Sequence, residues 1–400
     1  MVLSYTSNLM AGENPMKSLR FKYVAVLVLA LSMVVMMGSG GHKKGLNDDA
    51  LDELEDAGVD KYLGEFEPVS SEDVGDGWTK HTFDPDGGNG PICIAGTPFS
   101  AFTRKGKSEK KLLIFEQGGG ACWQDFYNCN ILSEDQEPPG PRQGIFDFDN
   151  KDNPFRKYSI LYMPYCDGSV FTGDNDVVDP NFPFGLVRYH RGLRNQSAAM
   201  DVAKEVFPKA KRITVAGSSA GGVGAAGFTP FLVRFLYGNK TKLTVFNDAG
   251  PVTVNPDALG DIAARAADWQ FDQFYPASCT DCDGQGDATE IIKWRLDNDS
   301  TIREAFYETD SDFTNRFFLG LLGNQPKFRD IVVSGHGALN DAHPKRYKRF
   351  IVANDGSHTA MQVPLFYSQT ADGVLLNEWT SSFLKKKKSW IDIVEEPLLP

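Results

Sequence analysis

The pattern Gly-x-Ser-x-Gly occurs at residues 217–221, with Ser219 at its centre. An apolar run typical of a strand precedes it, and a run compatible with a helix follows. In this context a serine forms a nucleophile elbow, a sharp turn that presents its hydroxyl above the carboxyl edge of a sheet. We therefore predict that Ser219 is a catalytic nucleophile and that the amide of Ala220, at the helix N-terminus, stabilises an oxyanion. The alternative is a packing turn rich in Gly and Ala.

A second glycine pattern, Gly-x-Gly-x-x-Gly, overlaps the first at Gly222, Gly224 and Gly227. A dinucleotide site would place these glycines in the strand-to-helix turn itself. Here the turn comes earlier, at Ser219. We expect the later glycines to lie within a helix and to let it pack closely onto the sheet.

Three consecutive glycines, Gly118 to Gly120, follow another probable strand upstream of the elbow. Hydrolases with a nucleophile elbow take oxyanion donors from such a loop. Glycines leave the backbone amides unobstructed, so this loop is the expected second source of donors. The aromatic residues just after it could border a substrate site or belong to the core; they are Trp123, Phe126 and Tyr127.

A nucleophilic serine needs a base and an acid, which in this class follow it in the order Ser, acid, His. His336, His343 and His358 lie beyond Ser219, and only His358 stands in a loop directly after a candidate strand. Loops at strand ends commonly carry catalytic residues, so we predict His358 as the base. The spacing does not choose among the acids between them, which are Asp310, Asp312, Asp330 and Asp341.

The elements that must position these residues alternate between strand and helix. Probable strands lie at 111–115, 158–163, 212–216, 242–246 and 349–353, with helical patterns at 194–206 and 220–236. Such alternation predicts an α/β fold with a mostly parallel central sheet flanked by helices. The stretch 125–152 has the composition of a long loop, and we expect residues 253–301 to form a cap or lid inserted into this fold.

The N-terminal region has the layout of a targeting segment. Lys17, Arg20 and Lys22 precede an apolar run at 23–37, and small residues follow. We predict that residues 1–41 are a signal peptide or a signal anchor, and that the acidic stretch 42–77 is a flexible stalk or propeptide. The catalytic domain would then span 78–400. The protein would be secreted or lumenal, or a type II membrane protein if the anchor is retained.

Six cysteines behind such a leader suggest disulfides. Short loops favour Cys122–Cys129 and Cys279–Cys282, which leaves Cys93–Cys166. Zinc at the Cys279 pair is disfavoured because no second pair of ligands is nearby. Weak glycosylation sequons, which also fit a secretory lumen, begin at Asn195, Asn239 and Asn298.

The chain has a formal net charge of −12. Acidic proteins repel nucleic-acid phosphates, so a nucleic-acid partner is not expected. We expect no metal or cofactor, and membrane contact only through a retained N-terminal segment. The lysines at 385–388 are a solvated surface run or a contact for a phospholipid or another polyanion.

Four segments together resemble the pectin acetylesterase family, which includes the Notum carboxylesterases. They are 113–123, 163–168 with Gly173 and Asp174, 217–222, and 355–358. The resemblance implies an α/β-hydrolase-like fold and metal-independent ester cleavage. It places the nucleophile at Ser219, the base at His358 and oxyanion donors at Gly119, Gly120 and Ala220.

The family's acid stands in an Asp-x-x-Gln pattern, and the nearest match here is Asp312 with Asn315 in place of Gln, with Asp310 as the reserve. The function implied is removal of O-acetyl groups from extracellular or cell-wall polysaccharide, so the expected partner is an acylated polysaccharide or another ester. One alternative is a Notum-like fatty-acyl deacylase or lipase. Another is a non-catalytic binding protein on the same fold.

Overall fold

The computed structural model describes residues 45–85, 88–133, 138–140, 143–282, 284 and 286–397. The predicted leader at 1–41 lies outside these residues and stays a prediction. Within the described ranges, no helix is long and apolar enough to cross a membrane.

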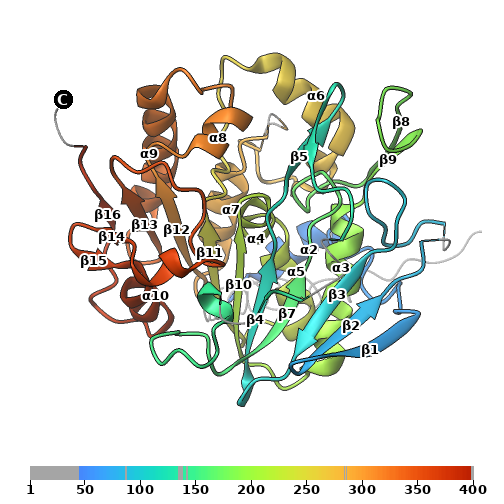
Figure 1. Cartoon of the computed structure of the whole chain (residues 1–400), viewed down its shortest axis with the longest axis horizontal. Helices are drawn as coiled ribbons and strands as arrows, with labels where there is room; N and C mark the ends of the chain where they lie inside the picture. The colour runs from blue at the N-terminus through green and yellow to red at the C-terminus, as the bar shows by residue number, and fades with distance from the viewer. Residues whose placement is uncertain are drawn as a thin grey trace, which may run out of the picture. The chain divides into compact units, whose positions relative to one another are not determined.

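A ten-stranded sheet runs through the folded unit in the order β1-β2-β3-β7-β4-β10-β11-β12-β13-β16 (Figure 1). The pairings from β7 to β16 are parallel, whereas β1, β2, β3 and β7 pair antiparallel. The predicted mostly parallel sheet is confirmed. Its strands are β1 (Ser70–Gly75), β2 (Trp78–Thr82), β3 (Ser100–Arg104), β4 (Ser108–Glu116), β7 (Tyr158–Met163), β10 (Arg212–Ser218), β11 (Lys242–Asp248), β12 (Arg303–Thr309), β13 (Tyr347–Val352) and β16 (Ile393–Val394).

Three two-stranded sheets and a set of helices complete the unit. The small sheets pair β5 (Gly120–Trp123) with β6 (Phe126–Cys129), β8 (Asn175–Val178) with β9 (Val187–His190), and β14 (Thr370–Ala371) with β15 (Val374–Leu375). The helices are α2 (Asp48–Asp56), α3 (Gly192–Val206), α4 (Ala220–Ala226), α5 (Thr229–Tyr237), α6 (Leu259–Trp269), α7 (Thr289–Asn298), α8 (Phe313–Phe318), α9 (Gln325–Ala342) and α10 (Leu376–Leu384), with short 3-10 turns η3 (Gly144–Phe146), η4 (Phe271–Phe274) and η5 (Pro364–Tyr367).

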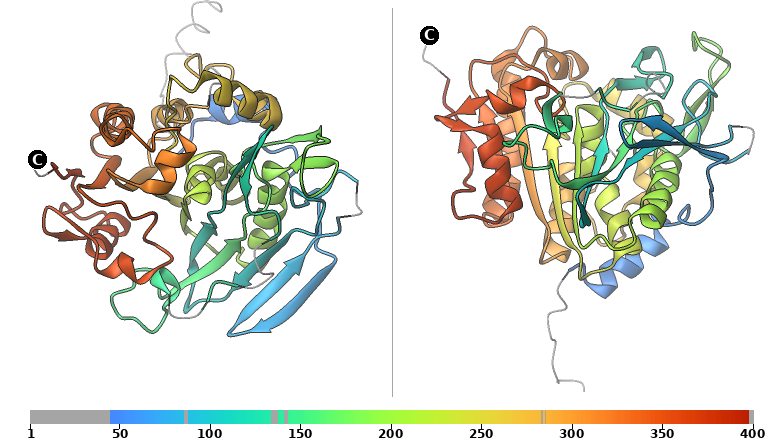
Figure 2. Two further views of the ribbon diagram at one scale, coloured as in Figure 1. Left: turned by 45° about the horizontal axis from the view of Figure 1, so that its top comes forward. Right: turned by 60° about the horizontal axis from the view of Figure 1, so that its bottom comes forward.

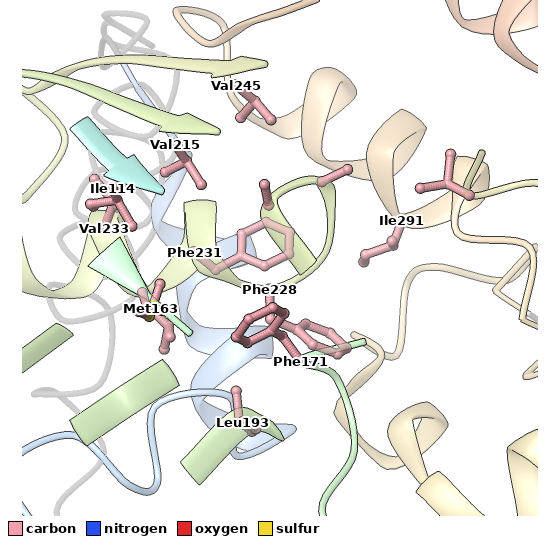
Figure 3. Close-up of a cluster of buried hydrophobic side chains, with 14 of the residues drawn as sticks. Ile114, Met163, Phe171, Leu193, Val215, Phe228, Phe231, Val233, Val245 and Ile291 are labelled. Atoms are coloured by element: carbon pink, nitrogen blue, oxygen red, sulfur yellow. The ribbon is translucent and has the colours of Figure 1, made fainter. Parts of the chain in front are cut away.

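Side chains of the central strands alternate between two hydrophobic cores, because successive residues of a strand point to opposite faces. Along β4, Ile114 belongs to the core that also contains residues of α2, α3, α5, α7 and α9. Leu113 and Phe115 belong to the other core, with residues of η3, η5 and α10. Figure 3 shows part of the first core, and Figure 2 shows helices on both sides of the sheet.

The helix predicted at 220–236 is two helices, α4 and α5, that meet around Gly227. Pro230 stands in the first turn of α5. Proline lacks an amide hydrogen and is tolerated in a first turn but not inside a helix, so a new helix starts there.

Strand β12 is not among the strands predicted from the sequence, because several of its residues are polar. Its two glutamates are buried, and each has a partner supplied by another element. Arg295 donates from Nε to Oε1 of Glu304 at 2.8 Å, and Asn315 donates from Nδ2 to Oε2 of Glu308 at 2.7 Å. Buried polar groups are tolerated when they are hydrogen-bonded, which a linear pattern does not reveal.

The flexible stalk expected at 42–77 is wrong for its described residues. Helix α2 begins at the N-cap Asn47, whose Oδ1 accepts a hydrogen bond from the Ala50 amide at 2.7 Å. Its apolar side is buried, since Ala50 is 2% and Leu54 0% exposed. Strands β1 and β2 place 70–82 in the main sheet, so folded structure begins well before residue 78. The many acidic residues on the exposed face of α2 led to the expectation of a flexible stalk, because only a narrow face of the helix is apolar.

The segment 253–301, expected to be an insertion, lies between β11 and β12 and contains α6, η4 and α7. The hairpin of β5 and β6 and the turn η3 occupy much of the expected loop at 125–152. The two disulfides predicted from short loops, Cys122 to Cys129 and Cys279 to Cys282, are present, and so is the remaining pair, Cys93 to Cys166.

Candidate active site

Ser219 occupies a strained turn between β10 and α4. Its backbone has φ 57° and ψ −121°, outside the regions that non-glycine residues prefer. Its amide donates to the Asp248 carbonyl at 2.8 Å. Strain of this kind persists only where the surroundings enforce it, and it is the geometry of a nucleophile elbow. The neighbouring amide of Ala220 opens α4, where the first amides have no partner within the helix.

The glycine loop presses against this elbow. A Cβ on Gly118 would lie 2.7 Å from the Ser218 carbonyl oxygen and 2.9 Å from the Ser219 Cβ. Such distances are too short for any side chain. Gly120, with φ 78°, lines the same cavity as Ser219 and Ala220. Gly119 lies between them, and its carbonyl accepts the Asn130 amide at 2.8 Å. The oxyanion role of these amides stays a prediction.

The overlapping glycine pattern serves close packing. A Cβ on Gly222 would lie 2.4 Å from Asn247 Oδ1, and one on Gly224 would lie 2.1 Å from Glu116 Oε2. These two glycines therefore let α4 sit directly on β11 and β4. The geometry is that expected for packing rather than for a dinucleotide.

His358 and Asp312 are joined by a short hydrogen bond of 2.6 Å between Nδ1 and Oδ2. Asp312 is fully buried, and its Oδ1 accepts the amide of Asn315 at 2.9 Å. The side-chain amide of Asn315 donates to Asp312 Oδ2 at 3.2 Å, so the shorter residue at this position still reaches the acid. The reserve acid, Asp310, instead contacts Ser311 and Arg329.

A second buried carboxyl, Glu308, stands behind Asp312 and is hydrogen-bonded to it. Burial first, and then the charge of Asp312, raises the pKa of Glu308 far above its ordinary value. Asn315 joins the two, because its Nδ2 donates to Glu308 Oε2 at 2.7 Å.

Asp248 connects the serine side of the site to the histidine side. It is fully buried at the end of β11, where its Oδ2 accepts the Ser218 hydroxyl at 2.5 Å and the Met361 amide at 2.9 Å. Its Oδ1 accepts the Ala360 amide at 2.9 Å. Burial raises the pKa of Asp248, which the hydrogen bond from Ser218 and the charge of His358 oppose. The loop that carries His358 is thus tied to the residue before Ser219.

A largely apolar cavity of about 120 Å³ opens beside Ser219. Gly120, Ala220 and Asn315 also line it, so the expected oxyanion donors and the partner of the acid face the same space. Its apolar walls come from β5, α4 and the turn after it, the 253–301 segment and α8, and include Trp123, Val223, Phe228, Ile262, Trp269 and Phe318.

Of the three aromatic residues proposed to contact substrate, Trp123 lines this cavity. Phe126 stacks on Trp123 with ring centroids 4.0 Å apart. The hydroxyl of Tyr127 donates to Asp179 at 2.7 Å, and its ring contacts Phe182. Phe126 therefore supports the wall indirectly, and Tyr127 belongs to a different cluster. A substrate contact at Phe126 or Tyr127 stays a prediction.

The sequon asparagines are engaged in the fold. Asn195 is 1% exposed and exchanges two hydrogen bonds with the Ile92 backbone, so glycosylation there is wrong for the folded chain. The side-chain nitrogens of Asn239 and Asn298 donate to the carbonyls of Leu46 and Trp294. Glycosylation at these two positions stays a prediction.

The remaining downstream histidines are structural. His336 is fully buried, stacks on Phe306 and contacts Tyr347, and burial lowers its pKa to about 3. His343 contacts Asp297 and Arg346. The thiols of Cys279 and Cys282 form a disulfide and so offer no thiolate to a metal.

Sequence reasoning missed Asp248 and Glu308. Asp248 ends the strand next to the nucleophile strand, a place where polar residues commonly serve a site, and that position could have identified it. Glu308 carried no comparable signal, because its role depends on burial beside Asp312.

A strained serine between a parallel strand and a helix, a glycine loop against it and a His–Asp pair define an α/β-hydrolase-like protein. The fold agrees with that of the crystal structure of the Wnt deacylase Notum from Drosophila, with a TM-score of 0.54 and 16% identity over 76% of this chain and 94% of that one. Residues 81–276 match the Pectinacetylesterase family model, which confirms the resemblance inferred from the motifs.

Two curated relatives agree with this assignment. Palmitoleoyl-protein carboxylesterase notum2 of Xenopus laevis is 28% identical over 142 residues, 33% of this chain and 28% of its own length. Pectin acetylesterase 7 of Arabidopsis thaliana is 29% identical over 153 residues, 34% of this chain and 36% of its own length. The chain therefore matches only about a third of the length of these relatives.

Proposed function

We propose that this protein is a serine carboxyl ester hydrolase. The observation that carries the proposal is the 2.6 Å bond between His358 Nδ1 and Asp312 Oδ2, made by residues 46 positions apart and tied through Asp248 to the Ser219 turn. A hydrogen bond at Nδ1 leaves the other ring nitrogen of His358 free to take a proton from a serine, as a catalytic base must.

In the proposed reaction, Ser219 Oγ attacks the ester carbonyl while its proton passes to His358 Nε2. The amides of Gly119, Gly120 and Ala220 hold the oxyanion of the tetrahedral intermediate. Collapse of the intermediate breaks the ester bond, and His358 returns the proton to the departing alcohol. A water molecule, deprotonated by His358, then cleaves the acyl-enzyme to release the acid and restore Ser219.

The first candidate substrate is an O-acetylated extracellular or cell-wall polysaccharide. The family model and the similarity to Pectin acetylesterase 7 support it. Three disulfides suit an oxidising compartment, which supports a secreted or lumenal location.

The second candidate carries a longer acyl group, and the cavity favours it. A dry protein cavity of about 150 Å³ binds benzene. The 120 Å³ beside Ser219 therefore suits an apolar group of roughly that size, larger than the methyl of an acetyl group. The relatives named palmitoleoyl-protein carboxylesterases agree with an acyl group longer than acetyl.

Hydrolysis of p-nitrophenyl acetate by the Ser219→Ala protein tests the mechanism. We expect kcat to fall roughly 10⁵–10⁶-fold, the loss typical of removing such a nucleophile. Ser334→Ala, on the exposed side of α9, is the matched control. An unchanged rate in a folded Ser219→Ala protein would eliminate the esterase proposal. The non-catalytic alternative predicts instead that a fluorophosphonate fails to label Ser219 in the wild type.

A chain-length series separates the two substrates. The rates kcat/KM for p-nitrophenyl acetate, butyrate, hexanoate and palmitate should be measured beside acetate release from acetylated pectin and xylan. A maximum at hexanoate supports the longer acyl group. A maximum at acetate, with release from a polymer, supports the polysaccharide.

A further inference from the structure

The hairpin of β8 and β9 projects from the same face of the molecule as the Ser219 cavity. In Figure 1 it lies at the upper right, at the level of β5 and α6, and the right view of Figure 2 shows it projecting beside them. β5 and α6 line the cavity with Trp123 and Ile262. The loop between β8 and β9 is held there by Phe182, whose ring centroid lies 5.6 Å from that of Tyr127 in β6. The end of the hairpin is therefore presented on the face that carries the candidate active site.

The end of this hairpin, residues 178–186, is called the tip and exposes apolar side chains. Val178 is 76% and Leu186 72% exposed, more than any other large apolar side chain in the described ranges. Single exposed apolar residues are ordinary, but a dense apolar group marks an interaction site. The exposed apolar side chains of the tip are those of Val178, Pro180, Pro183, Phe184 and Leu186.

The tip presents no charge to the solvent. Asp179 is its single charged residue and is only 5% exposed. Asp179 Oδ2 accepts hydrogen bonds from Arg188 Nε at 2.8 Å and from the Tyr127 hydroxyl at 2.7 Å. The other polar residue, Asn181, is uncharged. Since an unpaired charge is expensive in hydrocarbon, the pairing of Asp179 removes the group that would most oppose entry into lipid.

The backbone of the tip forms several hydrogen bonds within the tip itself. The amides of Asp179 and Phe182 donate to the carbonyls of Leu186 and Asp179, at 2.9 and 3.1 Å. The amide of Asn181 donates to Asp179 Oδ1 at 3.0 Å. The two prolines of the tip have no amide hydrogen to satisfy. Hydrocarbon offers no partner to backbone groups, so a segment that enters it must supply its own.

Helix α8 adds a second exposed apolar group on this face. Phe313, Leu322 and Phe317 are 62%, 43% and 39% exposed. The ring centroid of Phe317 lies 5.7 Å from that of Phe126 in β6, and the next residue, Phe318, lines the cavity. Apolar surface therefore continues from the cavity wall to the exterior.

We propose that the tip inserts into the surface of a neutral lipid bilayer and holds the Ser219 cavity against it. A protein partner is disfavoured, because protein interfaces typically contain about ten hydrogen bonds and this tip is apolar and bonded largely to itself. An anionic surface is disfavoured, because the chain carries −12. The lipid that fits is therefore zwitterionic, such as phosphatidylcholine. Docking of the tip does not depend on ester hydrolysis, and it is separate from any contact made by the predicted leader.

A tryptophan placed at the tip tests insertion in the full chain. In Phe184→Trp, the emission added relative to the wild type should shift to shorter wavelength with phosphatidylcholine vesicles. It should be quenched when the acyl chains of the lipid carry bromine. Ile391→Trp is the matched control and should show neither change. Ile391 is 51% exposed and precedes β16, which runs parallel to β13, so it lies towards the edge of the sheet opposite the cavity.

Flotation with phosphatidylcholine vesicles measures how much the tip contributes to docking. The double variant Phe184→Asp, Leu186→Asp should bind about tenfold or more weakly than the wild type, because each change places a charge in hydrocarbon. Ile391→Asp should bind as the wild type does. All three side chains are exposed, so each variant should fold, which an unchanged urea unfolding curve checks. Ser219→Ala should float like the wild type, which separates docking from the esterase proposal.

An unquenched tryptophan at position 184 would overturn the proposal, even if the leader bound the vesicles. Unchanged flotation of the double variant would overturn it as well. Binding only to vesicles that contain phosphatidylserine, lost as salt is added, would indicate an electrostatic contact elsewhere on the chain. A dimer that the double variant dissociates, without vesicle binding, would assign the tip to a second copy of the chain. Either of these results would equally overturn the proposal.

Discussion

The Asp248 carboxylate accepts the backbone amide of Ala360 at 2.9 Å, joining the end of β11 to the loop that carries His358. The same carboxylate accepts a hydrogen bond from the hydroxyl of Ser218, next to the proposed nucleophile Ser219. The chain segments of Ser219 and His358 are thus fixed to one buried group rather than to each other.

Asp248→Asn should therefore reduce catalysis. The asparagine keeps one acceptor oxygen, but its nitrogen is a donor, so one of the two backbone amides, Ala360 or Met361, loses its acceptor and the His358 loop shifts. A misplacement of about 1 Å costs roughly 10²-fold in rate, and we expect that loss in kcat with a smaller change in KM. Steady-state kinetics measure it, with exposed Asp341→Asn as the control. A folded variant with wild-type kcat would show that Asp248 does not position the base.

Asp312→Asn should lower kcat about 10⁴-fold, because an amide at this position favours the wrong tautomer of His358. The variant keeps the oxygen that caps α8, so the fold should persist. Asp310→Asn tests the alternative acid and should leave kcat within a few-fold of the wild type. A large loss in Asp310→Asn, with activity retained in Asp312→Asn, would reverse the assignment.

The ionisation of Glu116 should lower the free energy of unfolding as the pH rises. Burial raises its pKa from 4.5 to about 8, and it accepts hydrogen bonds from Thr229 and Gln196. Between these values the folded state holds a proton that the unfolded state has lost, so this group's contribution declines from pH 4.5 upward and is lost above 8.

Glu116→Gln should remove that decline, since its neutral amide can donate to Gln196 Oε1, which has no partner among the described residues. Urea unfolding of both proteins at pH 5, 7 and 9 measures the effect. The variant should gain stability relative to the wild type as pH increases. Parallel pH curves would contradict the prediction.

Ile262→Trp should shorten the preferred acyl group. Ile262 lies on α6, is 4% exposed and lines the cavity beside Ser219. The larger ring would occupy the space available to a hexanoyl chain and leave room for acetyl. We expect kcat/KM for p-nitrophenyl hexanoate to fall about tenfold relative to acetate, the size of effect known for hydrophobic pockets. An unchanged ratio would show that the acyl group binds elsewhere.

Local patterns predicted much of the fold. The strands β4, β7, β10, β11 and β13 are confirmed, because each is an apolar run between breakers. The same local patterns did not predict strand β12 or the packed helix α2. In β12 the buried glutamates are hydrogen-bonded by side chains from α7 and α8, and in α2 the buried residues form a narrow face of an acidic helix.

The sequence by itself determined the elbow at Ser219, the glycine loop and the expectation of His358, since these depend on neighbouring residues within one turn. It left four acids open, because the choice depends on which carboxylate the chain brings to the imidazole. Only the tertiary structure joined Asp312 to His358, enclosed Glu308 behind it and placed Asp248 between the segments of Ser219 and His358. These relationships arise from burial and from contacts between segments far apart in the chain, which no linear spacing records.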